Sequence, residues 1–296
     1  MNKERKKLLL ILNPSSGQKK ANRYIVDIVS LFNQAGFDCM FHVTQNAGDA
    51  NDYVTENASL YDIIVCIGGD GTLNEVIAGI MHSGNNTPIG YIPSGSTNDF
   101  ANSLGLSKNV IQAAKNIISG TPHSYDIGCF NGRYFSYIAS FGAFAKTSYD
   151  TPQTLKNSLG HLAYVMESIK ELPLKPVHAK VTVKDEVYED NYIFAAVSNS
   201  TSVAGILTLD SNLVDMNDGL LEVMLIKNPE NPAEFSQIAW ALTMQQYECD
   251  CIKFISTDSV IIEASPDVNW TLDGEFSEGN DTVEIKNIHN AIRIIK

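Results

Sequence analysis

The stretch that decides the fold reads YDIIVCIGGDGTLNE and covers residues 61–75. Its first part, Tyr61–Ile67, is an apolar run with the length of a buried strand, whereas Leu73–His82 places its apolar residues on one helical face. Three glycines within Gly68–Gly71 join the two parts. Because glycine has no Cβ, backbone N–H groups in such a loop can approach a ligand closely. The stretch therefore predicts a strand, a glycine loop and a helix whose first turn binds an anion.

The glycine loop also contains an acid, Asp70, which would repel a bare phosphate group. Its presence is explained if Mg²⁺ lies between the carboxylate and the phosphate, as in nucleotide chemistry. Thr72, followed three residues later by Glu75, predicts a capping box at the start of the helix. The alternative is a tight turn with a helix cap, but such a turn requires only one or two glycines.

The residues around this stretch alternate between strand and helix patterns from residue 8 to residue 126. Apolar strands that alternate with helices predict a parallel sheet covered on both faces. The expected strands are Leu8–Leu12, Phe37–Thr44, Tyr61–Ile67 and Ile89–Ile92, and the expected helices are residues 20–35, Asp49–Asn57, Leu73–His82 and Asp99–Leu104, with Val110–Ser119 continuing the alternation.

Two further loops of small residues follow strands of this predicted sheet. One spans Asn13–Gly17 and the other Pro93–Phe100. In a parallel sheet the carboxyl ends of the strands share one edge, and ligands bind in the crevice there. Either loop alone could be an ordinary connection, but together with the glycine loop they predict a nucleotide pocket.

After about residue 127 the pattern changes to strands of period two, which predicts an antiparallel sandwich or barrel. We place one domain at residues 1–127, together with residues 291–296, and a second at residues 128–290. The last strand, Ala291–Ile295, could pair with either domain. Strands are expected at Arg133–Ala139, Ala179–Val183, Tyr192–Ser198, Gly219–Ile226, Cys251–Ser256, Ser259–Ala264, Val268–Leu272 and Asp281–Ile285, with helices at Leu159–Leu172 and Pro232–Met244.

Two groups of carboxylates stand out in this second half. Glu275 follows Asp273 and Gly274 at the end of a strand, where a carboxylate could accept a proton from an attacking hydroxyl. Asp215 and Asp218 are three residues apart in a loop, a spacing that could bind a hard cation. Taken alone, the first is also a common hairpin turn and the second is equally a solvated turn.

Composition excludes several classes of protein. The chain has 296 residues, 21 Lys and Arg against 34 Asp and Glu, and a formal net charge of −13, which argues against nucleic-acid binding. No apolar run approaches the ~20 residues of a membrane-spanning helix. The five dispersed cysteines are typical of reduced thiols. We therefore expect a cytoplasmic protein without a transmembrane segment.

Taken in order, the motifs resemble those of the bacterial diacylglycerol and lipid kinase family, which includes the catalytic domain of sphingosine kinases. The resemblance runs through essentially the whole chain, and the order of the set is specific, whereas Gly-Gly-Asp-Gly alone is shared with NAD kinases and phosphofructokinases. The motifs are N-P-x-S-G at 13–17, G-G-D-G-T-x-N-E at 68–75, P-x-G-[ST]-x-N-D-F at 93–100, D-I-G at 126–128, Asn217-Asp218-Gly219 and D-G-E at 273–275.

The resemblance implies an N-terminal α/β domain with a parallel sheet, a C-terminal antiparallel β-sandwich, and an active site in the cleft between them. It implies ATP and Mg²⁺ as cofactors, with Asp70 and Asp126 in the network around the catalytic Mg²⁺ and Glu275 as the base. Asp215, Asp218 and the Leu220 carbonyl would hold a structural Mg²⁺. The implied nucleotide site consists of Asn13, Pro14, Ser15, Ser16, Gly17, Thr44, Gly69, Asp70, Gly71, Thr72, Leu73, Asn74, Glu75 and Ser96.

The activity implied by the resemblance is transfer of the ATP γ-phosphoryl group to a lipid hydroxyl, first of all diacylglycerol, which gives phosphatidic acid. The partner would be a lipid at the membrane surface, contacted peripherally, and a homodimer is left open. Two alternatives remain: a kinase of NAD or another soluble substrate, and a nucleotide-binding regulator without turnover. Gln18, where the family often has Lys, is the one departure that supports the regulator.

Overall fold

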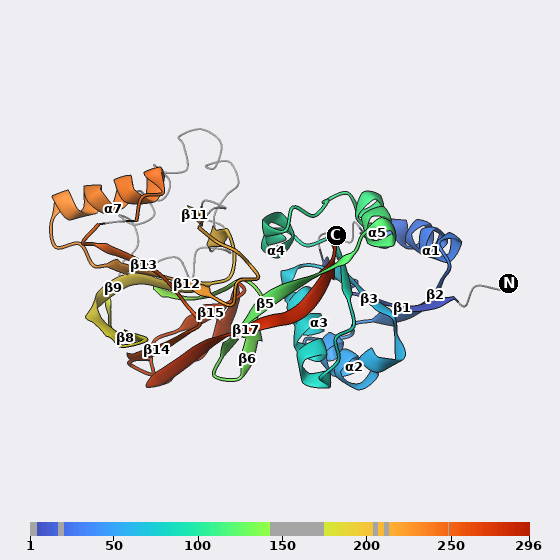
Figure 1. Ribbon diagram of the computed structural model, residues 1–296, viewed down its shortest axis with the longest axis horizontal. Coiled ribbons are helices and arrows are strands. Elements are labelled where there is room, and N and C mark those ends of the chain that lie inside the picture. The colour runs from blue at the N-terminus through green and yellow to red at the C-terminus, as the bar shows by residue number, and fades with distance from the viewer. Residues whose placement is uncertain (1–4, 17–20, 143–174, 204–206, 210–212, 248) are drawn as a thin grey trace. The chain divides into compact units, whose positions relative to one another are not determined.

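The computed structural model describes residues 5–16, 21–142, 175–203, 207–209, 213–247 and 249–296 (Figure 1). The chain divides into two compact units. Unit 1 contains Met1–Ile127 and His289–Lys296, and unit 2 contains Gly128–Ile288.

Unit 1 is built on a parallel sheet with the strand order β4-β3-β1-β2. Strands β1, β3 and β4 are buried on both faces, as parallel strands between helices require, whereas the edge strand β2 is partly exposed. Helices α1 and α5 cover one face and α2 and α3 the other (Figure 1). The strands are β1 (Lys6–Leu12), β2 (Phe37–Val43), β3 (Ile63–Gly68) and β4 (Ile89–Pro93), and the helices are α1 (Ile25–Gln34), α2 (Asp49–Asn57), α3 (Asp70–Ser83), α4 (Asp99–Ser103) and α5 (Val110–Ser119), with 3-10 turns η2 (Ala21–Tyr24) and η3 (Ala58–Leu60).

Unit 2 is antiparallel, with the strand order β16-β15-β7-β9-β8-β14-β17, and β12 pairs with both β9 and β13. Its core centres on Trp270, whose ring lies 5.0 Å from that of Phe130 and 4.9 Å from that of Phe141. The elements are β6 (Arg133–Phe135), β7 (Ile138–Gly142), β8 (Val177–Val183), β9 (Glu186–Ser198), β10 (Ser202–Val203), β11 (Leu207–Thr208), β12 (Leu221–Lys227), α7 (Pro232–Met244), β13 (Ile252–Thr257), β14 (Ser259–Ala264), β15 (Trp270–Leu272) and β16 (Glu275–Ser277).

Two long strands continue from one unit into the other: β5 (Pro122–Phe130) and β17 (Thr282–Ile295). The expected strands Asp281–Ile285 and Ala291–Ile295 are both parts of β17. Its first residues pair with β14, and Ile294 pairs in parallel with Ile89 of β4. The last strand therefore contributes to both units.

The expected fold class is confirmed: parallel strands precede antiparallel ones, with an α/β half and a sandwich half. One expected strand, Arg133–Ala139, is wrong, because it is broken into β6 and β7. The N–H groups of Ser136 and Tyr137 bond to a carboxylate instead of to a neighbouring strand. The expected helix Leu159–Leu172 lies outside the described residues. No helix in the described part of the chain is both long enough and apolar enough to cross a membrane.

Candidate active site

Three loops of unit 1 contact one another at the carboxyl edge of the sheet. They follow the adjacent strands β1, β3 and β4, whose ends are in register at Leu12 with Ile67 and at Gly68 with Pro93. Asn13 Nδ2 donates to Thr72 Oγ1 at 2.9 Å, which joins the first loop to the second. The hydroxyls of Ser16 and Ser94 lie 3.1 Å apart and join the first loop to the third.

The second and third loops approach each other closely at two glycines, and the space is tightest at Gly95. A Cβ placed on Gly95 would lie 2.6 Å from Gly69 Cα, and one placed on Gly69 would lie 3.2 Å from Gly95 Cα. Asn98 closes the third loop from within, since its side chain accepts from Gly95 N–H and donates to Gly95 C=O, both at 2.9 Å. The glycines of these two loops therefore create the close approach of backbones on which an anion site depends.

The carboxylate of Asp70 links the glycine loop to the third loop. It accepts the N–H groups of Asp99 at 3.1 Å and Phe100 at 3.4 Å, at the start of α4. Asp70 therefore fixes the third loop relative to the second, whatever it also does toward a cation.

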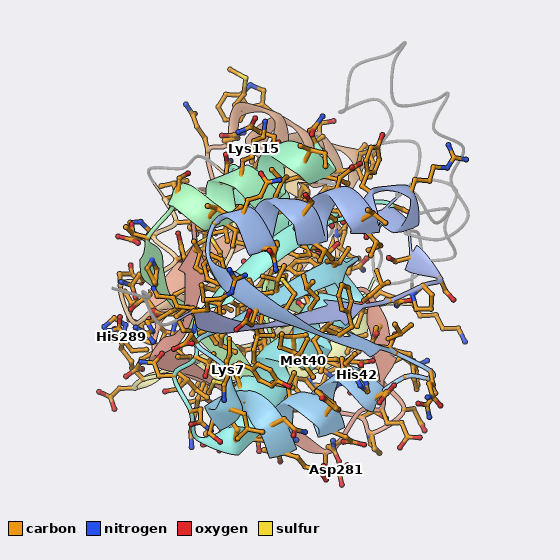
Figure 2. All side chains as sticks on the ribbon, turned by 90° about the vertical axis from the view of Figure 1, so that its right-hand side faces the viewer. Lys7, Met40, His42, Lys115, Asp281 and His289 are labelled. Carbon is orange, nitrogen blue, oxygen red and sulfur yellow. The ribbon has the colours of Figure 1, made fainter. Side chains whose placement is uncertain are left out.

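Asp126 lies on β5 and is fully buried. Its carboxylate accepts Asn290 N–H at 2.8 Å and lies 2.9 Å from His289 Nδ1. His289 is half-exposed, and its side chain is labelled in Figure 2. Asp126 thus ties β5 to the part of β17 that belongs to unit 1.

The predicted capping box at the start of α3 is wrong. The helix begins at Asp70, and its N-cap is Gly69, which has no side chain that could cap it. Glu75 instead accepts the N–H groups of Gly48 at 2.8 Å and Ala50 at 3.1 Å, and so caps α2. A glycine N-cap contributes no side-chain acceptor of its own to the first N–H groups of α3, which suits an anion site.

The other predicted nucleotide-site residues differ in their exposure and in their position along the loops. Leu73 is fully buried, so its side chain belongs to the core, and Ser96 is exposed. Thr44 follows β2 and donates its N–H to Leu12 C=O at 2.9 Å, so it lies beside the first loop. Ser15 N–H donates to Asn13 Oδ1 at 2.9 Å within that loop. Of the remaining predicted residues, Pro14 lies in the first loop, and Gly71 and Asn74 lie at the start of α3. Gly17, like Gln18, lies outside the described residues.

In unit 2 the two acids of the Asp-Gly-Glu motif have different environments. Asp273 is buried, and its carboxylate accepts the N–H groups of Ser136, Tyr137 and Ile138 and the hydroxyl of Ser136, at 2.5 to 3.0 Å. Burial raises the pKa of Asp273, and these hydrogen bonds act in the opposite direction. Asp273 and Gly274 form the turn between β15 and β16 with φ of +50° and +85°, the left-handed values of a two-residue hairpin.

Glu275, by contrast, is exposed at the start of β16. Its Oε2 accepts a hydrogen bond from Arg133 Nη2 at 3.1 Å. Asp273 therefore anchors the hairpin, and Glu275 is the acid of the pair that a substrate can reach.

The predicted cation-binding loop precedes β12. Asp215 accepts Asn217 N–H, Asp218 accepts Leu220 N–H, and Leu220 C=O accepts from Asn287 Nδ2 at 2.8 Å. Within the described residues, no three His, Cys, Asp or Glu side chains are arranged to hold a metal ion. Two carboxylates and a carbonyl nevertheless suit Mg²⁺, which keeps several waters and needs few protein ligands.

A third acid, Glu222, lies near this loop and favours the binding of a cation there. It is 1% exposed on β12, and its Oε2 has no hydrogen-bond partner within the described residues. Burial, followed by the negative charge of Asp218, raises the pKa of Glu222 to about 8. A buried acid beside two others is the environment that a divalent cation stabilises.

Comparison with known proteins gives the family. The model of the diacylglycerol kinase catalytic domain matches residues 7–130, and that of the YegS C-terminal NAD kinase beta sandwich-like domain matches residues 138–296. A diacylglycerol kinase of Bacillus subtilis (strain 168) is 34% identical, with 98% of this chain and 96% of the relative covered. The chain belongs to the diacylglycerol kinase family. It is therefore an enzyme of the lipid kinase type.

Two further members of the diacylglycerol kinase family agree with this assignment. A diacylglycerol kinase of Staphylococcus saprophyticus is 30% identical, over 92% of this chain and 90% of its own length. A crystal structure of a diacylglycerol kinase from Bacillus anthracis (strain Sterne) has a TM-score of 0.76 and 25% identity, over 99% of this chain and 98% of that chain. The similarity therefore covers both units, as expected for a diacylglycerol kinase.

Three residues near the candidate site were not predicted from the sequence. Arg133 and His289 contact predicted site residues but lie more than a hundred positions away from them in the chain, and no local pattern marks them. Glu222 did leave a signal, because it is an acid within the apolar run of β12, LEVMLIK.

Proposed function

We propose that the chain transfers the γ-phosphoryl group of ATP to the hydroxyl of a lipid, diacylglycerol, and so forms phosphatidic acid. The observation that carries this proposal is the mutual contact of three small-residue loops at one edge of the unit 1 sheet. The backbones of the second and third loops approach each other closely at Gly69 and Gly95. Such a cradle of N–H groups fits a chain of phosphates. The names of the relatives favour diacylglycerol as acceptor.

In this proposal residues 1–127, with the C-terminal residues, bind the nucleotide, and residues 128–290 bind the lipid. The nucleotide would lie against the loops that carry Asn13–Gly17, Gly69–Glu75 and Ser96, beside Thr44. Phosphoryl transfer depends on positioning and charge neutralisation more than on covalent help. Loops held by each other's side chains meet the first requirement.

Glu275 would be the base that takes the proton of the lipid hydroxyl. Its exposure supports the role, because the acceptor must reach it, and the anchored Asp273 gives it a fixed position. General-base help of this kind contributes roughly 10²–10⁴-fold to a rate.

Mg²⁺ would be held in two places. Asp70 and Asp126 would belong to the network around the catalytic ion, and Asp215, Asp218 and the Leu220 carbonyl would hold a structural ion. Bound Mg²⁺ neutralises phosphate charge in phosphoryl transfer. The setting proposed is the cytoplasm, with peripheral contact to the membrane surface and a homodimer in solution, which sedimentation would test.

The decisive variant is Glu275→Gln, which keeps the shape of the side chain but removes the base. We expect transfer to fall by about 10²-fold or more while ATP affinity, measured calorimetrically, stays near that of the wild type. Glu278→Gln, an exposed acid three residues further on, is the matched control and should keep full activity. Wild-type rates in Glu275→Gln would remove Glu275 from the mechanism.

A substrate panel separates the alternatives. Labelled Mg·ATP is incubated with diacylglycerol micelles, sphingosine micelles or NAD, and the labelled product is identified. Phosphatidic acid is the expected product. Labelled NAD would favour the soluble-substrate kinase, and ATP binding without any product would favour the non-catalytic regulator.

A further inference from the structure

The exposed carboxylate of Glu275 does not stand alone. The guanidinium of Arg133 uses two separate N–H groups on the hairpin: Nη2 donates to Glu275 Oε2 at 3.1 Å, and Nη1 donates to Phe276 C=O at 3.3 Å. One contact fixes a side chain and the other fixes the backbone next to it. A planar fork suits this double task better than a point charge.

Arg133 begins a short segment that grips the Asp-Gly-Glu hairpin from two directions. Three residues further on, Ser136, Tyr137 and Ile138 donate to the Asp273 carboxylate. All of these residues belong to unit 2. The segment 133–138 therefore holds the turn at Asp273 and the acid at Glu275 together.

The pairing distinguishes the two oxygens of Glu275. Oε2 is engaged by Arg133, whereas Oε1 has no hydrogen-bond partner within the described residues. We propose that Arg133 is a positioning residue, which holds the Glu275 carboxylate so that Oε1 is the oxygen that accepts the proton of the lipid hydroxyl. This inference rests on the proposed role of Glu275 as the base.

The O–H bond of the lipid breaks, and its proton passes to Glu275 Oε1. The electron pair stays on the lipid oxygen, which forms the new bond to the γ-phosphorus. The bond from that phosphorus to the bridging oxygen breaks, and ADP leaves with its electron pair.

The pair is too exposed to be explained by stability. The side chains of Arg133 and Glu275 are 42% and 52% exposed, and ion pairs of this kind contribute little to folding. Loss of Arg133 should therefore change catalysis and leave folding almost unchanged.

The first test compares Arg133→Ala and Arg133→Lys with the wild type. We expect kcat to fall roughly 10–100-fold in Arg133→Ala, with KM for ATP unchanged, because a misplaced base slows chemistry but not nucleotide binding. The kcat of Arg133→Lys should lie between those of Arg133→Ala and the wild type. Millimolar guanidinium should restore part of the activity of Arg133→Ala. The control is Lys180→Ala, which removes an exposed ion pair with Glu263 elsewhere in the sandwich and should keep the wild-type kcat.

The second test is a double-mutant cycle with Glu275→Gln. If Arg133 acts through Glu275, adding Arg133→Ala to Glu275→Gln should not lower the residual rate further. A further drop of the same size, a raised KM for ATP, or a lowered unfolding midpoint in both Arg133 variants would overturn the inference. The inference would also be overturned if Arg133→Ala kept the wild-type kcat while Glu275→Gln was inactive. That result would leave Glu275 as the base but would show that it does not need Arg133. An active Glu275→Gln would instead remove the base, and with it the ground for this inference.

Discussion

At the scale of single residues, two acids separated by one glycine have opposite properties. Asp273 is buried and accepts hydrogen bonds from three backbone N–H groups and a hydroxyl, whereas Glu275 is exposed with one oxygen unengaged by the described residues. A carboxylate that is fully hydrogen-bonded in a buried site is a structural anchor. An exposed one on an anchored turn is available for proton transfer. The division of roles follows from which acid lies in the turn and which begins the next strand.

Glu222 gives a prediction about pH. Its pKa is raised from an ordinary 4.5 to about 8, so between these values folding takes up a proton. Stability from this group is therefore fully present below pH 4.5 and is lost as the pH rises through about 8. In EDTA, Glu222→Gln should flatten the decline in the free energy of unfolding of unit 2 between pH 5 and 8.

Tryptophan fluorescence during urea unfolding provides the measurement, because both tryptophans of the chain, Trp240 and Trp270, lie in unit 2. Glu263→Gln, at an exposed acid on β14, should keep the wild-type slope. An identical slope in Glu222→Gln would mean that Glu222 is ionised in the folded protein.

At the scale of elements, the contact between the second and third loops predicts the effect of one added methyl group. In Gly95→Ala the new Cβ would lie 2.6 Å from Gly69 Cα and 2.9 Å from Asn98 Oδ1. Backbone cannot yield as a side-chain tip can, so the loops must separate. We expect ATP affinity, measured calorimetrically with Mg²⁺, to fall about 10-fold or more, because the displaced loops no longer hold their N–H groups in position for the phosphates.

The matched control is Gly84→Ala at the other end of α3. Gly84 has φ of +66° and no atom within 4 Å of its Cβ position. Alanine disfavours this left-handed φ, so the substitution should destabilise the fold by about 1 kcal/mol and leave the ATP affinity unchanged. Equal affinities in Gly95→Ala and the wild type would show that the close approach is not needed for nucleotide binding.

The elements themselves were largely predictable, because their hydrophobic periods were clear. The continuous run Leu8–Leu12 is buried on both faces of a parallel sheet, and Pro232–Met244 is a helix capped by Asn231. The three loops could be brought to one edge because parallel strands end on the same side.

The failures come from contacts that only the folded chain creates. Glu75 fits a local capping box, yet it caps α2 because the tertiary structure brings Gly48 to it. The run Arg133–Ala139 alternates like one strand, yet a carboxylate from Asp273 takes the N–H groups that would continue it. In both cases a side chain that is distant in sequence competes with a local pattern, and sequence alone does not show which wins.

At the scale of the whole molecule, the candidate groups are divided between the two units. The loops that would bind the nucleotide lie in unit 1, and Glu275, Arg133 and the Asp215–Leu220 loop lie in unit 2. The two predicted roles of Mg²⁺ are therefore separable by experiment, because one depends on nucleotide and the other does not.

Without nucleotide, Mg²⁺ should stabilise unit 2 through its structural site alone. A ligand at 100 times its dissociation constant stabilises the folded state by about 2.7 kcal/mol, so the fluorescence-detected unfolding midpoint of the wild type should rise with Mg²⁺. Asp218→Asn should abolish the rise and keep its ATP affinity. Asp185→Asn, an exposed acid between β8 and β9, should behave as the wild type does. A wild-type Mg²⁺ response in Asp218→Asn would place the structural ion elsewhere, since a neutral amide at that position removes one of the two carboxylates proposed to hold it.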